Sequence, residues 1–180
     1  MRTVIYFHGY QSNCQTEKFE RTKAFFAQYG IQVVGMDLDY EEIPPQAIDK
    51  IVDLVFQRHQ IIGCIGCSLG GYWANRSGVL HRVAVAVVNP AIDFYQTKAK
   101  SVPSLAAYKK EKSYVQPNHA SRLVVLGTDD EVLDYRVAQQ AFDANEVKLI
   151  EGGSHAGYEF LDEFLQDALN TFQKSVFYHA

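Results

Sequence analysis

Gly66-Cys67-Ser68-Leu69-Gly70 follows the G-x-S-x-G pattern and comes directly after the apolar run Ile61–Ile65. The run predicts a buried strand, and a helix is expected to begin near Gly71. In such a sharp strand-to-helix turn the serine takes a strained backbone conformation, and the flanking glycines avoid collisions with the neighbouring strand and helix. The pattern therefore predicts that Ser68 is a nucleophile raised above the edge of a sheet.

The rest of the chain supplies strands and helices for such a sheet. Six short β-rich runs are mostly apolar throughout, as expected for strands covered on both faces of a parallel sheet. They are Thr3–Phe7, Ile31–Met36, Ile61–Ile65, Val83–Val88, Leu123–Leu126 and Val147–Ile150. Helical spacing lies between them, as in Ile48, Ile51, Val52 and Val55. The alternation predicts an open, six-stranded, mostly parallel sheet with helices on both faces, which binds ligands at the carboxyl ends of its strands.

Size and composition predict one folded domain. The chain has 180 residues, of which 47% are hydrophobic and 21% charged, close to the average for soluble globular proteins. It shows no internal repeat or interdomain linker, so we expect a single domain over residues 1–180. One connection is long, and residues 91–120 within it are predicted to form a lid-like insertion after the fourth strand. Tyr95 and Tyr108 in this insertion are candidates for contacts with a substrate.

Charge and targeting signals narrow the classes of function. The net charge is −4 and no basic stripe is present to neutralise a phosphate backbone, so nucleic acid is not an expected partner. The first apolar run, Val4–Phe7, is too short for a signal-peptide core or a membrane span, which predicts a cytoplasmic protein. The insertion is locally basic, with five lysines against two acids: Lys98, Lys100, Lys109, Lys110 and Lys112 against Asp93 and Glu111.

The three cysteines are expected to be free thiols, as their odd number and low density fit a reducing compartment. Cys64 and Cys67 form a C-x-x-C pattern. Three steps along a strand separate their Cα atoms by about 10 Å, whereas a disulfide needs less than about 7 Å. We therefore expect Cys64 to be a core residue. Cys67 precedes the predicted nucleophile in the chain, and we expect no part for it in the chemistry.

A serine hydroxyl needs a general base, and the general base needs an acid to fix its tautomer. His155 is the predicted base, because it lies between the last strand and the last helix, at the active-site edge of the sheet. His59 and His81 precede strands and belong to the opposite edge. The other candidates are less well placed: His8 lies in a turn, His119 in the insertion and His179 in the tail.

The predicted acid follows the strand Leu123–Leu126. Asp130 suits a turn three residues past Gly127, and Asp129 is the alternative. Glu131 and Asp134 are expected to be solvated or to cap a helix that begins near Asp134. The chain order Ser68, Asp130, His155 is similar to that of α/β-hydrolases and differs from that of chymotrypsin or subtilisin, so we expect a minimal α/β-hydrolase fold.

An oxyanion hole must be built from backbone N–H groups near Ser68. The N–H of Leu69, next after the nucleophile, is one expected donor. The N–H of Tyr10, in the loop after the first strand, is the other. In this loop His8 and Gly9 are candidate substrate-binding residues, although the His8 side chain is more often a turn-stabilising element than a catalyst. No metal ion and no cofactor are expected.

These residues resemble the YqiA-type esterases, small bacterial proteins of family UPF0227. The matching stretches are Phe7–Gly9, Cys67–Ala74, Asn89–Ala91, Asp130–Arg136 and Glu151–Ala156. One departure is Asp129, where glycine is expected. The resemblance implies a cytoplasmic esterase acting on acyl esters or acyl-CoA thioesters. A related YcfP-like branch shares the Gly-Gly-Tyr-Trp-Ala stretch and is expected to lack the elbow serine, so by Ser68 this chain resembles the catalytic branch.

The sequence therefore predicts a serine esterase whose small-molecule substrate is an acyl ester or thioester. Ser68 is expected to attack the carbonyl, His155 to move the proton and Asp130 to orient the imidazole. Three alternatives remain open. An acyl-CoA thioesterase, with the basic insertion attracting coenzyme A, or an acyltransferase would use the same triad. A non-catalytic binding module is the third, because fold does not fix function.

Overall fold

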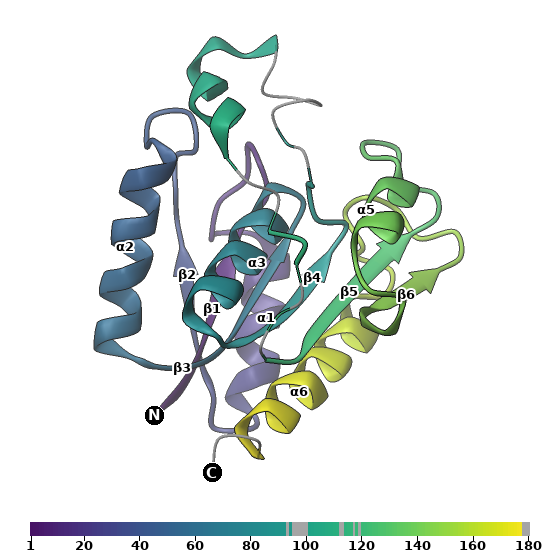
Figure 1. Ribbon diagram of the computed structural model, residues 1–180. Coiled ribbons are helices and arrows are strands. Elements are labelled where there is room, and N and C mark those ends of the chain that lie inside the picture. Colours follow the sequence, from purple (N-terminus) through teal and green to yellow (C-terminus); the bar gives the residue numbers. More distant parts are fainter. Residues whose placement is uncertain (93, 95–100, 112–113, 117, 119, 178–180) are drawn as a thin grey trace.

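The computed structural model describes residues 1–92, 94, 101–111, 114–116, 118 and 120–177. These residues form a six-stranded parallel sheet with the strand order β2-β1-β3-β4-β5-β6 (Figure 1). The strands are β1 Arg2–Phe7, β2 Gln32–Met36, β3 Gln60–Cys67, β4 Ala84–Val88, β5 Arg122–Gly127 and β6 Val147–Ile150. The predicted fold is confirmed, and each predicted strand boundary lies within two residues of the observed one. Every strand pair is parallel.

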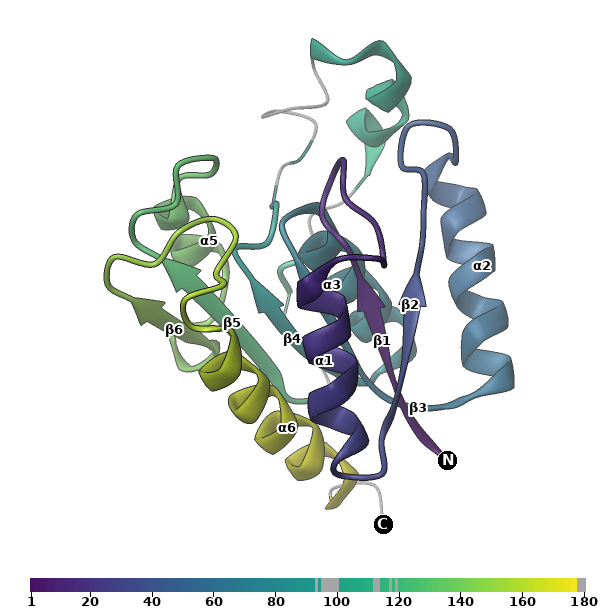
Figure 2. The same ribbon diagram turned by 180° about the vertical axis from the view of Figure 1, so that it is seen from behind.

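Helices cover both faces of this sheet. They are α1 Glu17–Ala27, α2 Pro45–Arg58, α3 Leu69–His81, α5 Tyr135–Ala141 and α6 Leu161–Phe177, with the 3₁₀ turns η2 Pro103–Lys110 and η3 Ala144–Glu146. One face carries α2, α3 and α5 (Figure 1), and the other carries α1 and α6 (Figure 2). Each face has its own apolar cluster, the first around Trp73 and Phe7 and the second around Phe26 and Phe172.

The helix boundaries follow from local signals. The Thr16 side chain accepts a hydrogen bond from the N–H of Phe19 and so caps α1, and Gly30, with φ 65°, lies where the chain turns after this helix. Helix α2 begins with a proline in its first turn. Its predicted apolar stripe is wrong at one position, because Ile51 is 36% exposed while Ile48 is fully buried.

The described part of the insertion packs onto α3. Leu105 and Tyr108 of η2 are buried, and Trp73 Nε1 donates a hydrogen bond to the Tyr108 hydroxyl at 3.1 Å. Arg76 on α3 forms an ion pair with Glu111 at 2.6 Å. Tyr108, predicted to contact substrate, therefore lies within the core beside Trp73. The other predicted contact from the insertion, Tyr95, lies outside the described residues.

The strand register brings several turns to one edge of the sheet. Phe7 pairs with Gly66, Cys67 pairs with Val88, and Gly127 pairs with Ile150. The strands are parallel, so the residues that follow β1, β3, β4, β5 and β6 all emerge at the same edge. This is the edge at which open α/β sheets bind ligands.

Helix α6 approaches β3 so closely that Gly63 has no room for a side chain. A Cβ atom at Gly63 would lie 2.6 Å from the Phe172 ring. We expect Gly63→Ala to lower the free energy of unfolding by about 1–3 kcal/mol, because the ring must move. Phe172→Leu removes that ring, so the double variant should lose less than the sum of the two single variants in urea denaturation. Additive losses would contradict this packing.

Candidate active site

Ser68 lies in the turn between β3 and α3 and has a strained backbone conformation, with φ 57° and ψ −123°. Three backbone hydrogen bonds hold it there. The Ser68 N–H donates to the Val88 carbonyl at 3.1 Å, and the Ser68 carbonyl accepts from the N–H groups of Tyr72 at 3.2 Å and Ala91 at 3.0 Å. A conformation that is costly for a residue with a Cβ atom persists only when its surroundings impose it, as these bonds do.

The two glycines of the motif are required by close backbone contacts. A Cβ atom on Gly66 would lie 2.2 Å from the Gly70 carbonyl oxygen, and one on Gly70 would lie 2.2 Å from the Phe7 carbonyl oxygen. Side chains at either position would therefore push α3 away from β3 and β1. Gly9 lies against Ser68 itself, because a Cβ atom there would be 3.6 Å from the Ser68 Cβ.

His155 and Asp130 form a direct pair. The His155 Nδ1 atom lies 2.8 and 2.9 Å from the two carboxylate oxygens of Asp130. The Asp130 side chain is 1% exposed and that of His155 is 15% exposed. Asp129, the alternative acid, has an exposed side chain, and its backbone N–H donates to the Gly153 carbonyl at 3.0 Å. The carboxylate that orients the imidazole is thus that of Asp130.

The environment of Asp130 favours its ionised form. Burial raises the pKa of the carboxyl, but the hydrogen bond from His155 and those from the backbone N–H groups of Leu133 and Val132 outweigh burial and lower the pKa below its ordinary value. Both backbone hydrogen bonds measure 2.8 Å. An ionised Asp130 accepts a hydrogen bond from Nδ1–H of His155, and in the neutral imidazole this arrangement leaves Nε2 without a proton.

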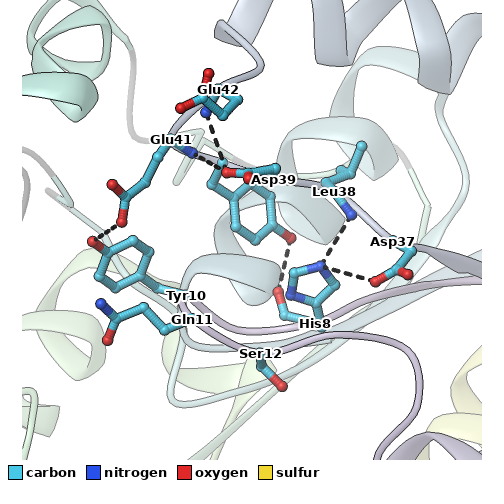
Figure 3. Close-up of a pocket in the computed structure, with 10 residues that line it drawn as sticks. His8, Tyr10, Gln11, Ser12, Asp37, Leu38, Asp39, Glu41 and Glu42 are labelled. Carbon is cyan, nitrogen blue, oxygen red and sulfur yellow. Dashed lines mark hydrogen bonds and ion pairs between the residues drawn. The ribbon is translucent and has the colours of Figure 1, made fainter.

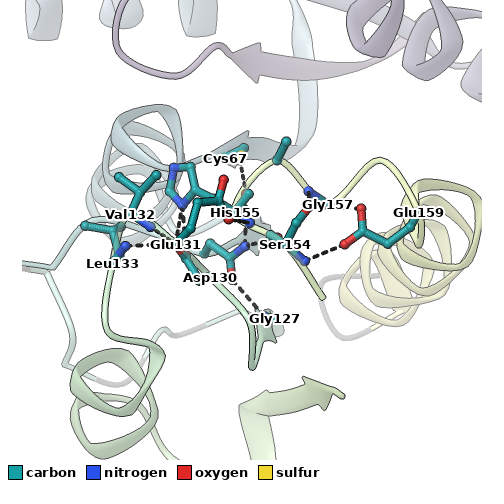
Figure 4. Close-up of polar contacts among 12 residues, drawn as sticks. Cys67, Gly127, Asp130, Glu131, Val132, Leu133, Ser154, His155, Gly157 and Glu159 are labelled. Atoms are coloured by element: carbon teal, nitrogen blue, oxygen red, sulfur yellow. Dashed lines mark hydrogen bonds and ion pairs between the residues drawn. The ribbon is translucent and has the colours of Figure 1, made fainter. Parts of the chain in front are cut away.

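The loop that carries His155 is held by polar groups from other parts of the chain (Figure 4). Asn89, directly after β4, donates from its side-chain nitrogen to the carbonyl oxygens of Ser154 and His155, each at 3.0 Å. The Asn89 side-chain oxygen accepts from the N–H of Gly127 at 2.8 Å. One buried amide therefore joins the end of β5 to the His155 loop.

Two glutamates bind the same loop. Glu131 accepts a hydrogen bond from the His155 N–H at 3.0 Å, and Glu159 accepts from both the N–H and the hydroxyl of Ser154. The prediction for Glu131 was incomplete: the residue is exposed, yet its carboxylate binds the backbone of His155. Asp134 caps α5 as predicted, since its side chain accepts from the Arg136 N–H.

The turn after β1 is organised by His8, whose side chain is buried. Its Nδ1 lies 2.7 Å from the Gly9 carbonyl oxygen, and its Nε2 lies 3.1 Å from the Leu38 nitrogen. A carbonyl only accepts and an N–H only donates, so these contacts require the neutral tautomer with the proton on Nδ1. Tyr40 adds a hydrogen bond to the His8 carbonyl at 2.8 Å. His8 therefore stabilises the turn that carries Tyr10.

Ser68 and His155 line one cavity of about 200 Å³. Its other lining residues are Tyr6, Gly9, Tyr10, Ser12, Thr16, Lys18, Cys67, Ala156 and Tyr158. Because it contains the predicted nucleophile and the predicted base, we call this cavity the catalytic pocket. Burial raises the pKa of the Cys67 thiol, which donates to the His155 carbonyl at 3.6 Å, so this cysteine stays a neutral thiol at pH 7.

A second cavity of about 490 Å³ adjoins the catalytic pocket and shares Tyr10 and Ser12 with it (Figure 3). Its wall includes four acidic residues: Asp37, Asp39, Glu41 and Glu42. We call it the acidic cavity. The Tyr10 hydroxyl donates to Glu41 at 2.6 Å, and Asp39 accepts from the backbone N–H groups of its own turn.

Lys18 is a pocket residue that was not predicted from the sequence. It lies in the first turn of α1, and its ammonium group donates to the Ala156 carbonyl and sits 4.6 Å from the centre of the Tyr158 ring. Asn89 was noted only as part of a matching stretch, and its hydrogen bonds to the His155 loop were not predicted. Within the described residues, no three His, Cys, Asp or Glu side chains gather to hold a metal ion, and no helix is long and apolar enough to cross a membrane.

Residues 3–173 match the sequence profile of the uncharacterised protein family UPF0227. The chain belongs to this family. One similar sequence is the UPF0227 protein YcfP of Salmonella paratyphi B, which is 26% identical over 147 residues, covering 77% of this chain and 81% of that protein.

Solved structures similar to this UPF0227 protein show the same fold. Mouse alpha/beta hydrolase domain-containing protein 10 matches with a TM-score of 0.75 at 14% identity, covering 96% of this chain and 90% of the mouse chain. An S-formylglutathione hydrolase from Agrobacterium tumefaciens matches with a TM-score of 0.69 at 14% identity, covering 96% and 83%. The α/β-hydrolase fold is thereby confirmed.

The Asn89 amide should fix the His155 loop. Asn89 has φ 44°, which glycine adopts freely, so Asn89→Gly removes the amide without adding strain. We expect it to lower the free energy of unfolding by about 2–3 kcal/mol, the effect of losing buried hydrogen bonds. Amide exchange in residues 151–157 should become faster while exchange in α6 is unchanged. Asn89→Ala should be less stable still, and unaltered exchange in the loop would contradict the assignment.

Ionised Asp130 should contribute a pH-dependent share of stability. Its pKa is lower in the folded protein, so the contribution is present above the unfolded value of about 4 and is lost as the pH falls through the folded value. We expect the stability difference between wild type and Asp130→Asn, measured by urea denaturation, to shrink below about pH 4. The exposed neighbour Asp129→Asn is the matched control and should show no such loss. If Asp129→Asn showed the loss and Asp130→Asn did not, the assignment of Asp130 as the buried, ionised carboxylate would be wrong.

Proposed function

We propose that this UPF0227 protein is a serine esterase that hydrolyses acyl esters through an acyl-enzyme intermediate. The observation that carries the proposal is the His155–Asp130 pair, with contacts of 2.8 and 2.9 Å, in a loop that shares a pocket with the strained Ser68. A nucleophile, a base and an orienting acid on separate turns of one sheet edge are the parts that acyl transfer needs.

In the first half-reaction, the Ser68 oxygen attacks the ester carbonyl carbon while Nε2 of His155 takes the hydroxyl proton. The carbonyl oxygen becomes an oxyanion, which the backbone N–H groups of Tyr10 and Leu69 bind. The bond to the alcohol oxygen then breaks, and the imidazolium returns its proton to that oxygen. The products are a free alcohol and an ester between the acyl group and Ser68.

In the second half-reaction, water replaces the alcohol. His155 takes a proton from water, the resulting hydroxide attacks the acyl-enzyme carbonyl, and the proton goes to the departing Ser68 oxygen. Asp130 remains ionised throughout, which its lowered pKa supports, and stabilises the imidazolium that forms in each half. The positive end of α3, which begins at Leu69, also favours the oxyanion.

The pocket gives some guidance on substrate size. A volume of about 200 Å³ is below the roughly 300–1,000 Å³ of typical ligand sites and fits short acyl or alcohol groups best. The acidic cavity beside it opposes an anionic leaving group such as coenzyme A. Oxygen esters of short acids are therefore the preferred class in this proposal, and acyl-CoA thioesters are the second class.

Replacement of the nucleophile gives the direct test. We expect Ser68→Ala to lower kcat for p-nitrophenyl butyrate by about 10⁴–10⁶, because the triad acts as a unit. Ser121→Ala, directly before β5 at the opposite edge of the sheet, is the control and should retain wild-type kcat. The same assay over a series of acyl chain lengths, with oxygen esters and acyl-CoA thioesters in parallel, identifies the substrate class.

Two results would overturn the proposal. The first is wild-type turnover by Ser68→Ala. The second is the failure of a fluorophosphonate probe to label the wild-type protein at Ser68, which would favour a non-catalytic binding role on this scaffold. Denaturant unfolding of the variants serves as the folding control. Glycine adopts the positive φ of residue 68 more readily than alanine does, so Ser68→Gly should unfold at a higher denaturant concentration than Ser68→Ala.

A further inference from the structure

The catalytic pocket contains one cationic group whose purpose the triad does not explain. Among the described residues that line it, Lys18 is the only one with a permanent positive charge at neutral pH. A charged group at the wall of a pocket of about 200 Å³ lies close to any substrate bound there. Its charge therefore bears directly on which substrates are accepted.

The Lys18 ammonium is held in place without being neutralised. It donates one hydrogen bond to the Ala156 carbonyl and lies 4.6 Å from the centre of the Tyr158 ring. None of the ion pairs among the described residues includes Lys18. An ammonium carries three donors, so a ligand oxygen can be bound while the contact with Ala156 is kept.

One negative charge near Lys18 has to be considered. The hydrogen bond from the Ser154 N–H and, to a smaller degree, the charge of Lys18 lower the pKa of Glu159. This carboxylate is already bound to the N–H and the hydroxyl of Ser154. Glu159 therefore orders the loop around Ser154 and leaves Lys18 available to a ligand.

The surrounding backbone adds positive potential. Thr16, the N-cap of α1, lines the catalytic pocket together with Lys18, and Ser68 at the start of α3 lines it too. The N-termini of two helices therefore meet at this pocket, each with the equivalent of about half a positive charge. Across Tyr10 and Ser12 the sign reverses, because the acidic cavity begins there.

We propose that Lys18 binds a carboxylate carried by the substrate, so that the preferred esters have an anionic group a few atoms from the scissile bond. This inference rests on the proposed function and adds the substrate class. The carboxylate lies on the Lys18 side of the pocket, because the acidic cavity repels it from the other side. Lys18 is a specificity-determining residue in this arrangement and takes no part in proton transfer.

A matched pair of esters tests the proposal. The first is mono-p-nitrophenyl glutarate, and the second is p-nitrophenyl 5-methylhexanoate, in which an isopropyl group replaces the carboxylate. With spontaneous hydrolysis subtracted, we expect wild type to prefer the glutarate ester in kcat/KM. Lys18→Met should reduce this preference about tenfold, mainly through KM, and Lys18→Arg should retain most of it. Raising the salt concentration should weaken the preference.

The control variant is Lys23→Met, on the same helix. Lys23 is exposed and pairs with Glu20 at 3.2 Å, away from the pocket lining, so both esters should keep their wild-type kcat/KM. Equal losses on both esters in Lys18→Met would overturn the proposal, because that result assigns Lys18 only to holding the Ala156 carbonyl. A wild type without preference for the glutarate ester would overturn it as well.

Binding without turnover separates this inference from the proposed function. Glutarate itself, titrated into the protein in a calorimeter, should bind to wild type and about tenfold more weakly to Lys18→Met. If the protein hydrolysed no ester but bound glutarate in a Lys18-dependent way, the proposed esterase function would be wrong and the carboxylate site would be supported. If glutarate bound equally to both proteins, or to neither, the carboxylate site would be contradicted. The esterase function would then be tested by Ser68→Ala alone.

Discussion

The close contact between three backbones at the elbow is the constraint on which the rest of the site depends. Gly70 touches the carbonyl of Phe7, and Gly66 touches the carbonyl of Gly70, so β1, β3 and α3 meet without intervening side chains. This contact brings the turn after β1 against Ser68. It also lets the start of α3 lie next to Ser68, the proposed nucleophile, where the helix dipole acts most strongly. A side chain at Gly70 would separate Ser68 from the turn after β1, which carries Tyr10, one of the two proposed oxyanion donors.

Asp130 and His155, the proposed acid and base, depend on a different set of contacts. The turn after β5 and the loop after β6 touch directly, since a Cβ atom on Gly127 would lie 2.2 Å from the Gly153 carbonyl oxygen. The Asn89 amide then bonds to both segments, and Glu131 binds the backbone of His155. The attraction between Asp130 and His155 is therefore exerted between groups that the backbone already holds together. Such preorganisation is what makes a buried polar pair effective in catalysis.

The sequence predicted the features that are encoded locally. The strands follow from short apolar runs, the elbow from its two glycines, and Asp130 from its distance past Gly127. Features that depend on distant contacts were not predictable in the same way. Asn89 donates a hydrogen bond to the carbonyl of a residue 66 positions away. The Lys18 ammonium donates one to the carbonyl of Ala156, which is 138 positions away. Tyr108 was predicted to contact the substrate because aromatic residues in an insertion suit a lid. In the structure its hydroxyl accepts a hydrogen bond from Trp73, which lets the side chain be buried in the core.

Tyr10 marks the boundary between the two electrostatic regions of the site. Its backbone N–H belongs to the proposed oxyanion hole, while its hydroxyl donates to Glu41 at 2.6 Å in the acidic cavity. An oxyanion that develops near four carboxylates is repelled by them, and the repulsion must be offset by positive potential. Salt screens this repulsion poorly, because the site is partly buried. In the proposed mechanism the positive end of α3, which begins at Leu69 directly after Ser68, supplies that potential. The reversal of charge across Tyr10 therefore has two consequences in the proposed mechanism: the oxyanion depends on the start of α3, and a carboxylate of the substrate is restricted to the Lys18 side of the pocket.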